Sequence, residues 1–409
     1  MNSRIARVFH SLIAPNPFIT LIMSFPIQRF SRAATPCYYY DMALLQRTVD
    51  SLKAAIAPYP HFHVHYAIKA NANPRILQCL SQAGLGADCV SGGEVEQAVA
   101  CGFPADRIVF AGVGKTDDEI RASLKAGISR FNVESVAELE VINELAAEMG
   151  VVAPVAFRVN PNVDAHTHAK ITTGLNENKF GIAVEDLLPA IRSAQAMANV
   201  CYCGLHFHIG SQILDLDVYE TLCDRVDEIE TMLEAHGIST PTLNLGGGLG
   251  IDYDAPDANP IPAFGEWISR IANRLKVREG QEVHFEPGRS IVAQCGTLIA
   301  RTIYVKQGHA KQFVIVDAGF TELIRPAMYG SHHAIQNLSA ADRGEQTTAT
   351  YDVVGPICES SDVFAKAEVL PLTQRGDLIA FRSAGAYGEV MASSYNCRHL
   401  RPTIYSDEC

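Results

Sequence analysis

Short hydrophobic runs alternate with amphipathic stretches along the middle of the chain. Each run is rich in β-branched and aromatic residues, and stretches such as 135–149 and 218–236 have apolar residues at helical spacing. The pattern predicts strands at 63–68, 86–90, 107–111, 129–133, 154–159, 202–207, 242–246 and 282–286. Eight strands that alternate with helices over about 250 residues favour an α/β fold of the (β/α)8 TIM-barrel type. An open doubly wound sheet is the alternative, but no G-x-G-x-x-G motif follows the first strand.

Three of the predicted helices begin with a capping pattern. A Ser or Thr is followed three residues later by Glu, at Ser91/Glu94, Thr116/Glu119 and Ser135/Glu138. In such a capping box the hydroxyl and the carboxylate each accept a hydrogen bond from a backbone N–H that the helix leaves unpaired. The pattern therefore supports helices directly after three of the predicted strands.

The pattern changes after about residue 290. Helical periodicity fades, and β-like segments appear at 298–306, 312–317, 350–354 and 378–382. The segment Cys37–Tyr40 is also β-like, although it precedes the barrel. We therefore expect residues 45–290 to form the barrel, and residues 23–44 and 291–409 to form a second, mostly antiparallel β domain.

The first residues of the chain differ from the rest. The first 34 residues contain several arginines and no acid, and Pro15 and Pro17 interrupt the apolar stretch 12–23. That stretch is too short to span a bilayer and lacks a signal-peptide cleavage pattern. We expect residues 1–22 to be a disordered or mis-started extension, with Met23 as the true start, and an organelle transit peptide is the alternative.

The charge and cysteine content narrow the range of partners and compartments. The formal net charge is −12, and no dense Lys/Arg run occurs, which argues against nucleic acid or an anionic membrane as the main partner. The 11 cysteines form no CxxC pair, so a disulfide scaffold or a zinc knuckle is not expected. Reduced thiols in the cytoplasm are the simpler interpretation.

The candidate chemistry lies at the predicted carboxyl ends of the strands, where barrels of this type carry their active groups. Lys69 follows the first strand, His208 and Ser211 follow the sixth, three glycines (246–248) follow the seventh, and the turn 286–289 follows the eighth. We expect desolvation to lower the pKa of Lys69 and free its amine as a nucleophile. A solvated lysine at a strand end is the alternative.

Glycine-bearing turns at this edge let backbone N–H groups approach a phosphate closely, although tight turns need glycine as well. A reactive lysine beside such a turn, with Glu286 nearby, suggests pyridoxal phosphate, whose ring nitrogen needs an acidic partner. His206 and His208 are spaced for a metal, as in barrel metallohydrolases, but lack evident further ligands at other strand ends. His206 is more simply a satisfied core residue.

Motifs along most of the chain resemble one family. They are YAIKAN (66–71), SGGE (91–94), FNVES (131–135), RVNPNVDAHTHAKITTGLNENKFGI (158–182), GLHFHIGSQ (204–212), LNLGGGLGIDY (243–253), EPGRSIVA (286–293), RPAMYG (325–330), VVGPICESSD (353–362) and AGAYGEVMASSYN (384–396). In order and without large gaps, they resemble the diaminopimelate decarboxylases, of the fold type III group of pyridoxal-phosphate enzymes. The resemblance runs from about Phe25 to the C-terminus and implies decarboxylation of meso-diaminopimelate to L-lysine and CO2, the last step of lysine biosynthesis.

The resemblance also implies a role for individual residues. Lys69 would form a Schiff base with the cofactor, His208 would stack on its ring, and Glu286 would meet its pyridine nitrogen. Further cofactor contacts are implied for Ser211, Gly248, Pro287, Gly288, Arg289 and Tyr387. Substrate contacts are implied for Arg289, Arg325, Tyr329, Glu359 and Tyr387. Cys358 would supply a proton, and together with Glu359 would complete the site of the partner chain in a homodimer.

Three other functions stay open on the sequence alone. One is a decarboxylase of another basic amino acid, namely ornithine, arginine or carboxynorspermidine. The arginine of the RPAMYG string disfavours it, since a basic substrate tail would prefer an acid there. A non-catalytic regulator that binds pyridoxal phosphate is another, but this chain keeps both Lys69 and Cys358. The third is a metallohydrolase barrel.

Overall fold

The computed structural model describes residues 25–163, 179–399 and 401–408. Eight parallel strands form a closed ring, because the first and last members of the strand order β5-β4-β3-β2-β10-β9-β8-β6 also pair with each other. The strands are β2 (Phe62–Ala67), β3 (Gly86–Cys89), β4 (Ile108–Phe110), β5 (Arg130–Val133), β6 (Ala153–Asn160), β8 (Val200–His206), β9 (Thr242–Asn244) and β10 (Glu282–Phe285). All eight predicted barrel strands are thus confirmed to within two residues.

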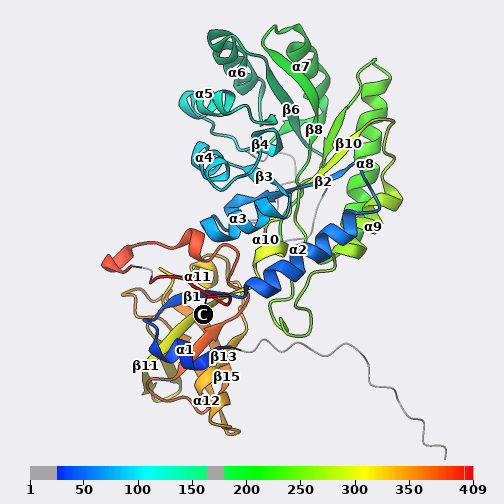
Figure 1. Ribbon diagram of the computed structural model, residues 1–409. Coiled ribbons are helices and arrows are strands. Elements are labelled where there is room, and N and C mark those ends of the chain that lie inside the picture. The colour runs from blue at the N-terminus through cyan, green and yellow to red at the C-terminus, as the bar shows by residue number, and fades with distance from the viewer. Residues whose placement is uncertain (1–24, 164–178, 400, 409) are drawn as a thin grey trace, which may run out of the picture.

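Helices surround the barrel on the outside, as Figure 1 shows. They are α2 (Met42–Ile56), α3 (Pro74–Gln82), α4 (Gly92–Ala100), α5 (Asp117–Ala126), α6 (Val136–Met149), α7 (Val184–Ala196), α8 (Asp217–Glu234) and α9 (Phe264–Arg274). Because helices cover one face of the strands and side chains fill the interior, both faces are buried, which explains the nearly continuous hydrophobic runs. A short strand, β7 (Ile182–Ala183), extends the ring at β6.

The three predicted helix starts are capped, but in two different ways. Thr116 and Glu119 form a reciprocal capping box at α5. Ser91 accepts from the N–H of Glu94 as expected, whereas the carboxylate of Glu94 accepts from Val90, one residue before the cap. Ser135 caps α6 in the same manner. In those two helices the glutamate therefore fixes the strand end that precedes the helix.

The second domain is a mixed sheet with the strand order β13-β16-β11-β12-β14-β15, and β1 pairs with β11 and β17. Its strands are β1 (Cys37–Tyr40), β11 (Gly296–Gln307), β12 (Gln312–Val316), β13 (Ile335–Asn337), β14 (Thr348–Val354), β15 (Val363–Pro371), β16 (Leu378–Phe381) and β17 (Ile404–Tyr405). The pairs β12–β14 and β1–β17 are parallel and the others antiparallel. The β-like segment before the barrel therefore lies in the sheet that follows it.

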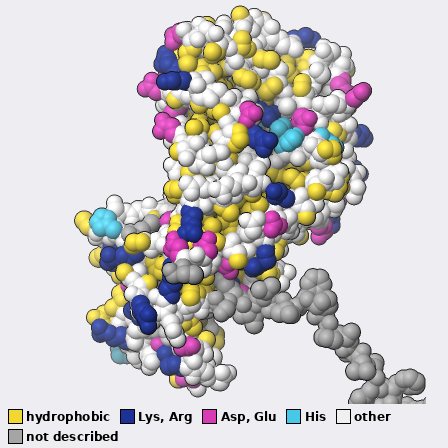
Figure 2. Space-filling view, in the orientation of Figure 1, with side chains coloured by type: hydrophobic (Ala, Val, Ile, Leu, Met, Phe, Trp, Pro, Cys, Tyr) yellow, Lys and Arg dark blue, Asp and Glu magenta, His cyan; other side chains and the backbone are white. Residues whose placement is uncertain are grey.

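Short helices complete the description. They are α1 (Ile27–Arg32), α10 (Arg289–Val292), α11 (Arg325–Tyr329) and α12 (Leu338–Asp342), with 3₁₀ turns η1 (Ile68–Ala70), η2 (Ala105–Arg107), η3 (Glu389–Met391) and η4 (Tyr395–Cys397). No helix among the described residues is long and apolar enough to cross a bilayer. On the face drawn in Figure 2, Lys and Arg side chains are dispersed among acidic ones. Residues 1–22, expected to be an extension, lie outside the described residues.

Asn71 fastens the barrel to the second domain. Its side-chain amide, 1% exposed, donates to the carbonyl of Gly385 at 2.8 Å and to the hydroxyl of Tyr40 at 2.7 Å. The backbone N–H of Tyr387 donates to Ala70 at 2.8 Å alongside. Both domains thus meet at the residues that directly follow Lys69, which fixes the position of that lysine relative to the second domain.

The first prediction concerns these contacts of Asn71 between the two domains. Replacing Asn71 with Ala leaves buried acceptors without a donor, and we expect it to destabilise the protein by about 2–3 kcal/mol. The measurement is urea unfolding followed by circular dichroism. The matched control is Asn273→Ala, an exposed asparagine on α9, which we expect to change stability by less than about 0.5 kcal/mol. Equal stability of both variants would contradict the role given to Asn71.

Candidate active site

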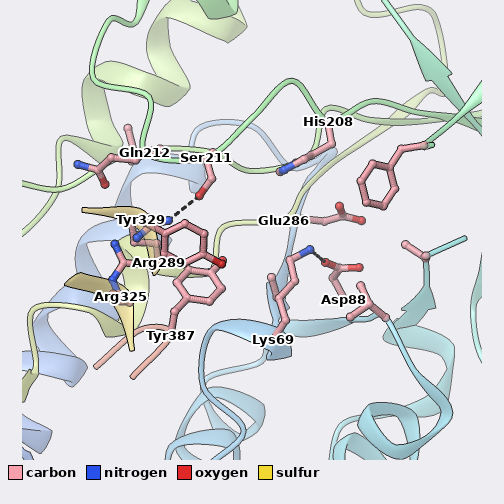
Figure 3. Close-up of a pocket in the computed structure, with 18 of the residues that line it drawn as sticks. Lys69, Asp88, His208, Ser211, Gln212, Glu286, Arg289, Arg325, Tyr329 and Tyr387 are labelled. Carbon is pink, nitrogen blue, oxygen red and sulfur yellow. Dashed lines mark hydrogen bonds and ion pairs between the residues drawn. The ribbon is translucent and has the colours of Figure 1, made fainter. Parts of the chain in front are cut away.

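A cavity of about 980 Å³ opens at the carboxyl ends of the barrel strands, where they face the second domain. Its walls bring together most of the residues that the sequence singled out, namely Lys69, His208, Ser211, Gly248, Glu286, Gly288, Arg289, Arg325, Tyr329 and Tyr387. Figure 3 shows Lys69, Asp88, Glu286 and His208 at one end and the arginines and tyrosines at the other. Asp88, Arg158 and Tyr253 also line it, although the sequence reasoning assigned them no role, and so does His206, which was expected to be a core residue.

Lys69 lies in the 3₁₀ turn η1 that directly follows β2. Its Nζ lies 3.5 Å from Oδ2 of Asp88 at the end of β3, and Asp88 is only 1% exposed. Burial by itself would lower the pKa of Lys69, but the nearby acidic groups, Asp88 foremost, outweigh it and raise the pKa. The expectation of a lowered pKa is therefore wrong for the chain by itself, because it considered desolvation without the carboxylate on the neighbouring strand.

Glu286 is a buried carboxylate at the end of β10. It accepts hydrogen bonds from Nε2 of His206 at 2.9 Å, from the amide of Asn244 at 2.6 Å and from that of Asn132 at 3.4 Å. Burial acts to raise its pKa, but the interactions with His206 and Lys69 outweigh it and lower the pKa far below the usual range. His206 is thus a buried residue with a partner, as expected, and its partner is the candidate cofactor-binding carboxylate.

The glycine turn after β9 allows a close approach of three backbone segments. A Cβ at Gly247 would collide with the carbonyl oxygen of Glu286, and one at Gly248, whose φ is +101°, would lie 2.7 Å from the carbonyl oxygen of Gly210. Only glycine fits both positions. A Cβ at Gly288 would lie 3.0 Å from that of Ala67, so the turn 286–289 is packed as closely. This part of the wall consists of backbone.

His208 lies above this turn and lines the cavity. The N–H of Gly247 donates to its Nδ1 at 3.4 Å. Burial, followed by the charges of Lys69 and Arg158, lowers the pKa of His208 well below its ordinary value. The ring is therefore neutral at physiological pH and presents a flat, uncharged face, which suits stacking better than ion pairing.

Two buried arginines lie side by side at the other end of the cavity. Nη1 of Arg289 donates to the hydroxyl of Tyr253 at 2.7 Å, and its Cζ lies 4.8 Å from the ring centroid of Tyr387. Cζ of Arg325 lies 5.9 Å from the ring centroid of Tyr329. Neither arginine forms an ion pair with a carboxylate of the described residues. Burial and the charge of Arg289 lower the pKa of Arg325, so an incoming anion would be stabilised here.

Cys358 and Glu359 do not line this cavity. Both are exposed, on the loop between β14 and β15. The hydroxyl of Tyr395 donates to Glu359 at 2.9 Å, and the N–H of Cys358 donates to the side chain of Asn396 at 3.4 Å. The described cavity of this chain therefore contains the lysine and the arginine pair but not the predicted thiol.

The described residues contain no group of three or more His, Cys, Asp or Glu side chains arranged to hold a metal ion. His206 is bonded to Glu286 through Nε2, and His208 faces the cavity. His166 and His168 lie outside the described residues. The donor set of the cavity therefore gives the metallohydrolase alternative no support.

Comparison with known proteins places the chain in a family. Residues 43–293 match the model of the pyridoxal-binding domain of the pyridoxal-dependent decarboxylases. The diaminopimelate decarboxylase of Bacteroides thetaiotaomicron is 56% identical over 94% of this chain and 98% of that relative.

Solved structures agree with this placement. Diaminopimelate decarboxylase from Helicobacter pylori, complexed with L-lysine, has a TM-score of 0.85 and 40% identity, covering 91% of this chain and 92% of that one. The corresponding enzyme from M. jannaschii, also with L-lysine, has a TM-score of 0.86 and 36% identity, covering 93% and 89%. The matches extend across both domains, so this chain belongs to the diaminopimelate decarboxylase family of pyridoxal-dependent decarboxylases.

Proposed function

We propose that this protein uses pyridoxal phosphate to decarboxylate meso-2,6-diaminopimelate to L-lysine and CO2, the last step of lysine biosynthesis. One observation carries the substrate choice: two buried arginines, Arg289 and Arg325, face the cavity that contains Lys69 and have no ion-pair partner among the described carboxylates. Ornithine and lysine lack a distal carboxylate that would pair with them. A site built to pair a charge rejects analogues that lack it.

The residues of the cavity fit pyridoxal phosphate. Lys69 offers the only described lysine amine in the cavity wall, and the glycine turn 246–248 leaves room that any Cβ would fill. The carboxylate of Glu286, whose pKa is lowered, suits a protonated ring nitrogen. The neutral ring of His208 suits stacking on the cofactor ring. Ser211, Gly248 and the turn Pro287-Gly288-Arg289 would hold the remaining parts of the cofactor.

Each group then has a defined task. Bound pyridoxal phosphate supplies an electron sink for the bond to the departing carboxyl group. Lys69 would hold the cofactor through Nζ. It must first lose a proton, for which Oδ2 of Asp88, 3.5 Å away, is an acceptor. Glu286 keeps the proton on the ring nitrogen. Arg289, Arg325 and Tyr329 hold the distal carboxylate of the substrate, and Tyr387 contacts both cofactor and substrate.

Reprotonation requires an acid, and the thiol that the family resemblance implies for this step does not line the described cavity of its own chain. We propose that Cys358 of a second copy delivers a proton to the carbon that has lost its carboxyl group, and that Glu359 meets the substrate's distal ammonium. The exposure of both residues on their own chain supports this arrangement. The protein would thus be a homodimer with two shared sites. Its ten described cysteines are free thiols, which supports a cytoplasmic location.

A second prediction concerns the lysine that holds the cofactor. Borohydride treatment of the protein with pyridoxal phosphate should place a stable label on Lys69, and Lys69→Ala should abolish the label together with activity. Peptide mapping locates the label. Lys115 is the buried internal control, because Glu138 holds its amine at 2.6 Å. Labelling at Lys115 or Lys179 instead would overturn the assignment.

A third prediction concerns substrate choice. Arg325→Met removes one charge-assisted pair with the distal carboxylate, and we expect kcat/KM for meso-diaminopimelate to fall by an amount equivalent to about 1.5–3 kcal/mol. The matched control is Arg343→Met, an arginine that follows α12, does not line the cavity and pairs with Asp377. Wild-type protein that decarboxylates ornithine as well as diaminopimelate would contradict the proposal.

The fourth prediction tests the shared site. Lys69→Ala and Cys358→Ala proteins should each be inactive alone. Mixed in equal amounts and allowed to exchange subunits, they should recover about a quarter of wild-type activity, because half of the dimers are mixed and each mixed dimer has one intact site of two. Light scattering with differently tagged chains verifies exchange. Mixtures that exchange but stay inactive would show that each chain builds its own site.

A further inference from the structure

The interior and the cavity rim of the barrel contain buried charges, and several of them are paired. Two ion pairs join cations to carboxylates at the strands and strand ends: Arg158–Glu134 at 3.0 Å and Lys69–Asp88 at 3.5 Å. Two charged groups in the interior remain, the guanidinium of Arg130 on β5 and the carboxylate of Glu286. Each is 5% exposed.

Arg130 forms no ion pair within the described part of the chain. Its Nη1 donates to the hydroxyl of Thr242 at 2.6 Å, and its Nη2 donates to Nε2 of His284 at 3.1 Å. Its Nε has no hydrogen-bond partner. A buried cation held only by neutral groups is strongly disfavoured, so the fold must supply a negative charge nearby.

The strand register places that charge one layer away. On three strands, the residue in the Arg130 layer lies two positions before a residue in the Glu286 layer: Arg130 before Asn132, Thr242 before Asn244, and His284 before Glu286. Asn132 and Asn244 both donate to Glu286. Residues two apart on a strand share a face and lie about 6.6 Å apart. His284, which accepts a hydrogen bond from Arg130, therefore lies in the layer beneath Glu286, and the guanidinium that reaches it lies below the carboxylate, on the side away from the cavity.

The histidines around Arg130 are neutral at physiological pH. The carboxylate of Glu282, two positions before His284 on β10, also lines the space next to Arg130, but its side chain is 47% exposed and it contacts His63 at 2.5 Å. Nδ1 of His65 donates to the carbonyl of Arg107 at 3.1 Å, and its Nε2 accepts from Nδ1 of His284 at 2.9 Å, which leaves Nε2 of His284 to accept from Arg130. Burial, followed by the charge of Arg130, lowers the pKa of His65 to about 4 and also lowers that of His284 well below its ordinary value. Burial raises the pKa of the thiol of Cys203. Arg130 is the cation of this layer.

We propose that Arg130 is a positioning residue for the reaction, which holds Glu286 as a carboxylate from the layer beneath it and so strengthens the hold of Glu286 on the cofactor's ring nitrogen. The inference rests on the proposed function, in which Glu286 meets that nitrogen. On the cavity side Glu286 interacts with His206, His208 and Lys69, and under the proposed function His208 and Lys69 also contact the cofactor. Arg130 does not line the cavity, so neither cofactor nor substrate would contact it.

The test is a double-mutant cycle between the two residues. Arg130→Gln and Arg130→Met remove the positive charge, whereas Arg130→Lys keeps it. Glu286→Gln removes the negative charge of the carboxylate. Binding of pyridoxal phosphate to the cofactor-free proteins is followed by quenching of Trp267, the single tryptophan, which packs on Phe285. The kcat and KM are measured on the same proteins. Arg121→Met, an exposed arginine that pairs with Glu148, is the control for losing a surface charge.

We expect the neutral variants of Arg130 to weaken cofactor binding and to lower kcat about tenfold each, with KM for the substrate changed less than about twofold, as for the loss of one nearby buried charge. Arg130→Lys should recover most of both losses. In the Glu286→Gln background the same change should have less than about a twofold further effect, because the coupling partner is absent. Circular dichroism identifies which neutral variant folds, and Gln keeps donors for Thr242 and His284.

Different results separate the two proposals. If neutralising Arg130 in the Glu286→Gln protein lowered cofactor binding and kcat as much as it does in the wild type, the role given to Arg130 would be overturned. The arginine would then act through the fold and not through Glu286. Failure of Arg130→Lys to recover cofactor binding, with the protein folded, would do the same. If Glu286→Gln itself left cofactor affinity and kcat unchanged, the role given to Glu286 under the proposed function would fail, and this inference with it.

Discussion

A carboxylate that stays ionised inside a protein needs several donors and a nearby positive charge, because water no longer solvates it. Glu286 meets that requirement in this barrel. Three side chains from three different strands donate to its two oxygens, and each of those side chains is fixed by a strand whose faces are both buried. The spacing of β5, β8, β9 and β10 is therefore tied to one carboxyl group. The polar side chains of the barrel interior that donate to Glu286 stabilise its negative charge.

The two arginines of the cavity come from different domains, so their position side by side depends on both. Arg289 begins α10 at the barrel rim, and Arg325 begins α11 in the second domain. Nδ1 of His333 donates to the carbonyl of Arg382 at 2.9 Å, so its Nε2 accepts from Nε of Arg325 at 3.4 Å. Burial and Arg325 lower the pKa of His333 to about 3, which keeps that acceptor available. A neutral histidine thus orients a cation without neutralising it, and the charge remains available for a ligand.

The strands and helices of the barrel could be predicted from the sequence because the patterns that indicate them are local. Buried parallel strands are continuous hydrophobic runs, and a Ser or Thr with a following Glu marks a helix start wherever it occurs. In the second domain β15 was missed, because VFAKAEVLP alternates small and charged residues on a strand with an exposed face. The short β13 and β17 have too few residues to show any period.

The site was predictable to the extent that its residues stand at strand ends or in recognisable motifs. Lys69, Glu286 and the glycine turn follow strands directly, so their convergence on one edge follows from the fold. Asp88 lies inside the short string GADCV. Nothing in that string indicates that its side chain points toward Lys69, which follows the neighbouring strand β2. The direction of the pKa shift of Lys69 was misjudged for this reason, since it depends on a neighbour that the pairing of β2 with β3 brings within 3.5 Å.

The loop that contains Cys358 is held in place by its own domain, although the thiol does not line the cavity of that chain. Oδ2 of Asp362 accepts from the N–H of Ile357 at 2.7 Å, and its Oδ1 accepts from Phe320 at 2.7 Å, so the loop is held by its own domain. A thiol on such a rigid, exposed loop can enter a neighbour's cavity without first being ordered, which limits the entropy lost on association. Under the proposed dimer, the cation pair and the lysine belong to one chain and the proton donor to the other. Substrate bound to a single chain would then lack its acid, and the protonation that completes the product would be coupled to assembly.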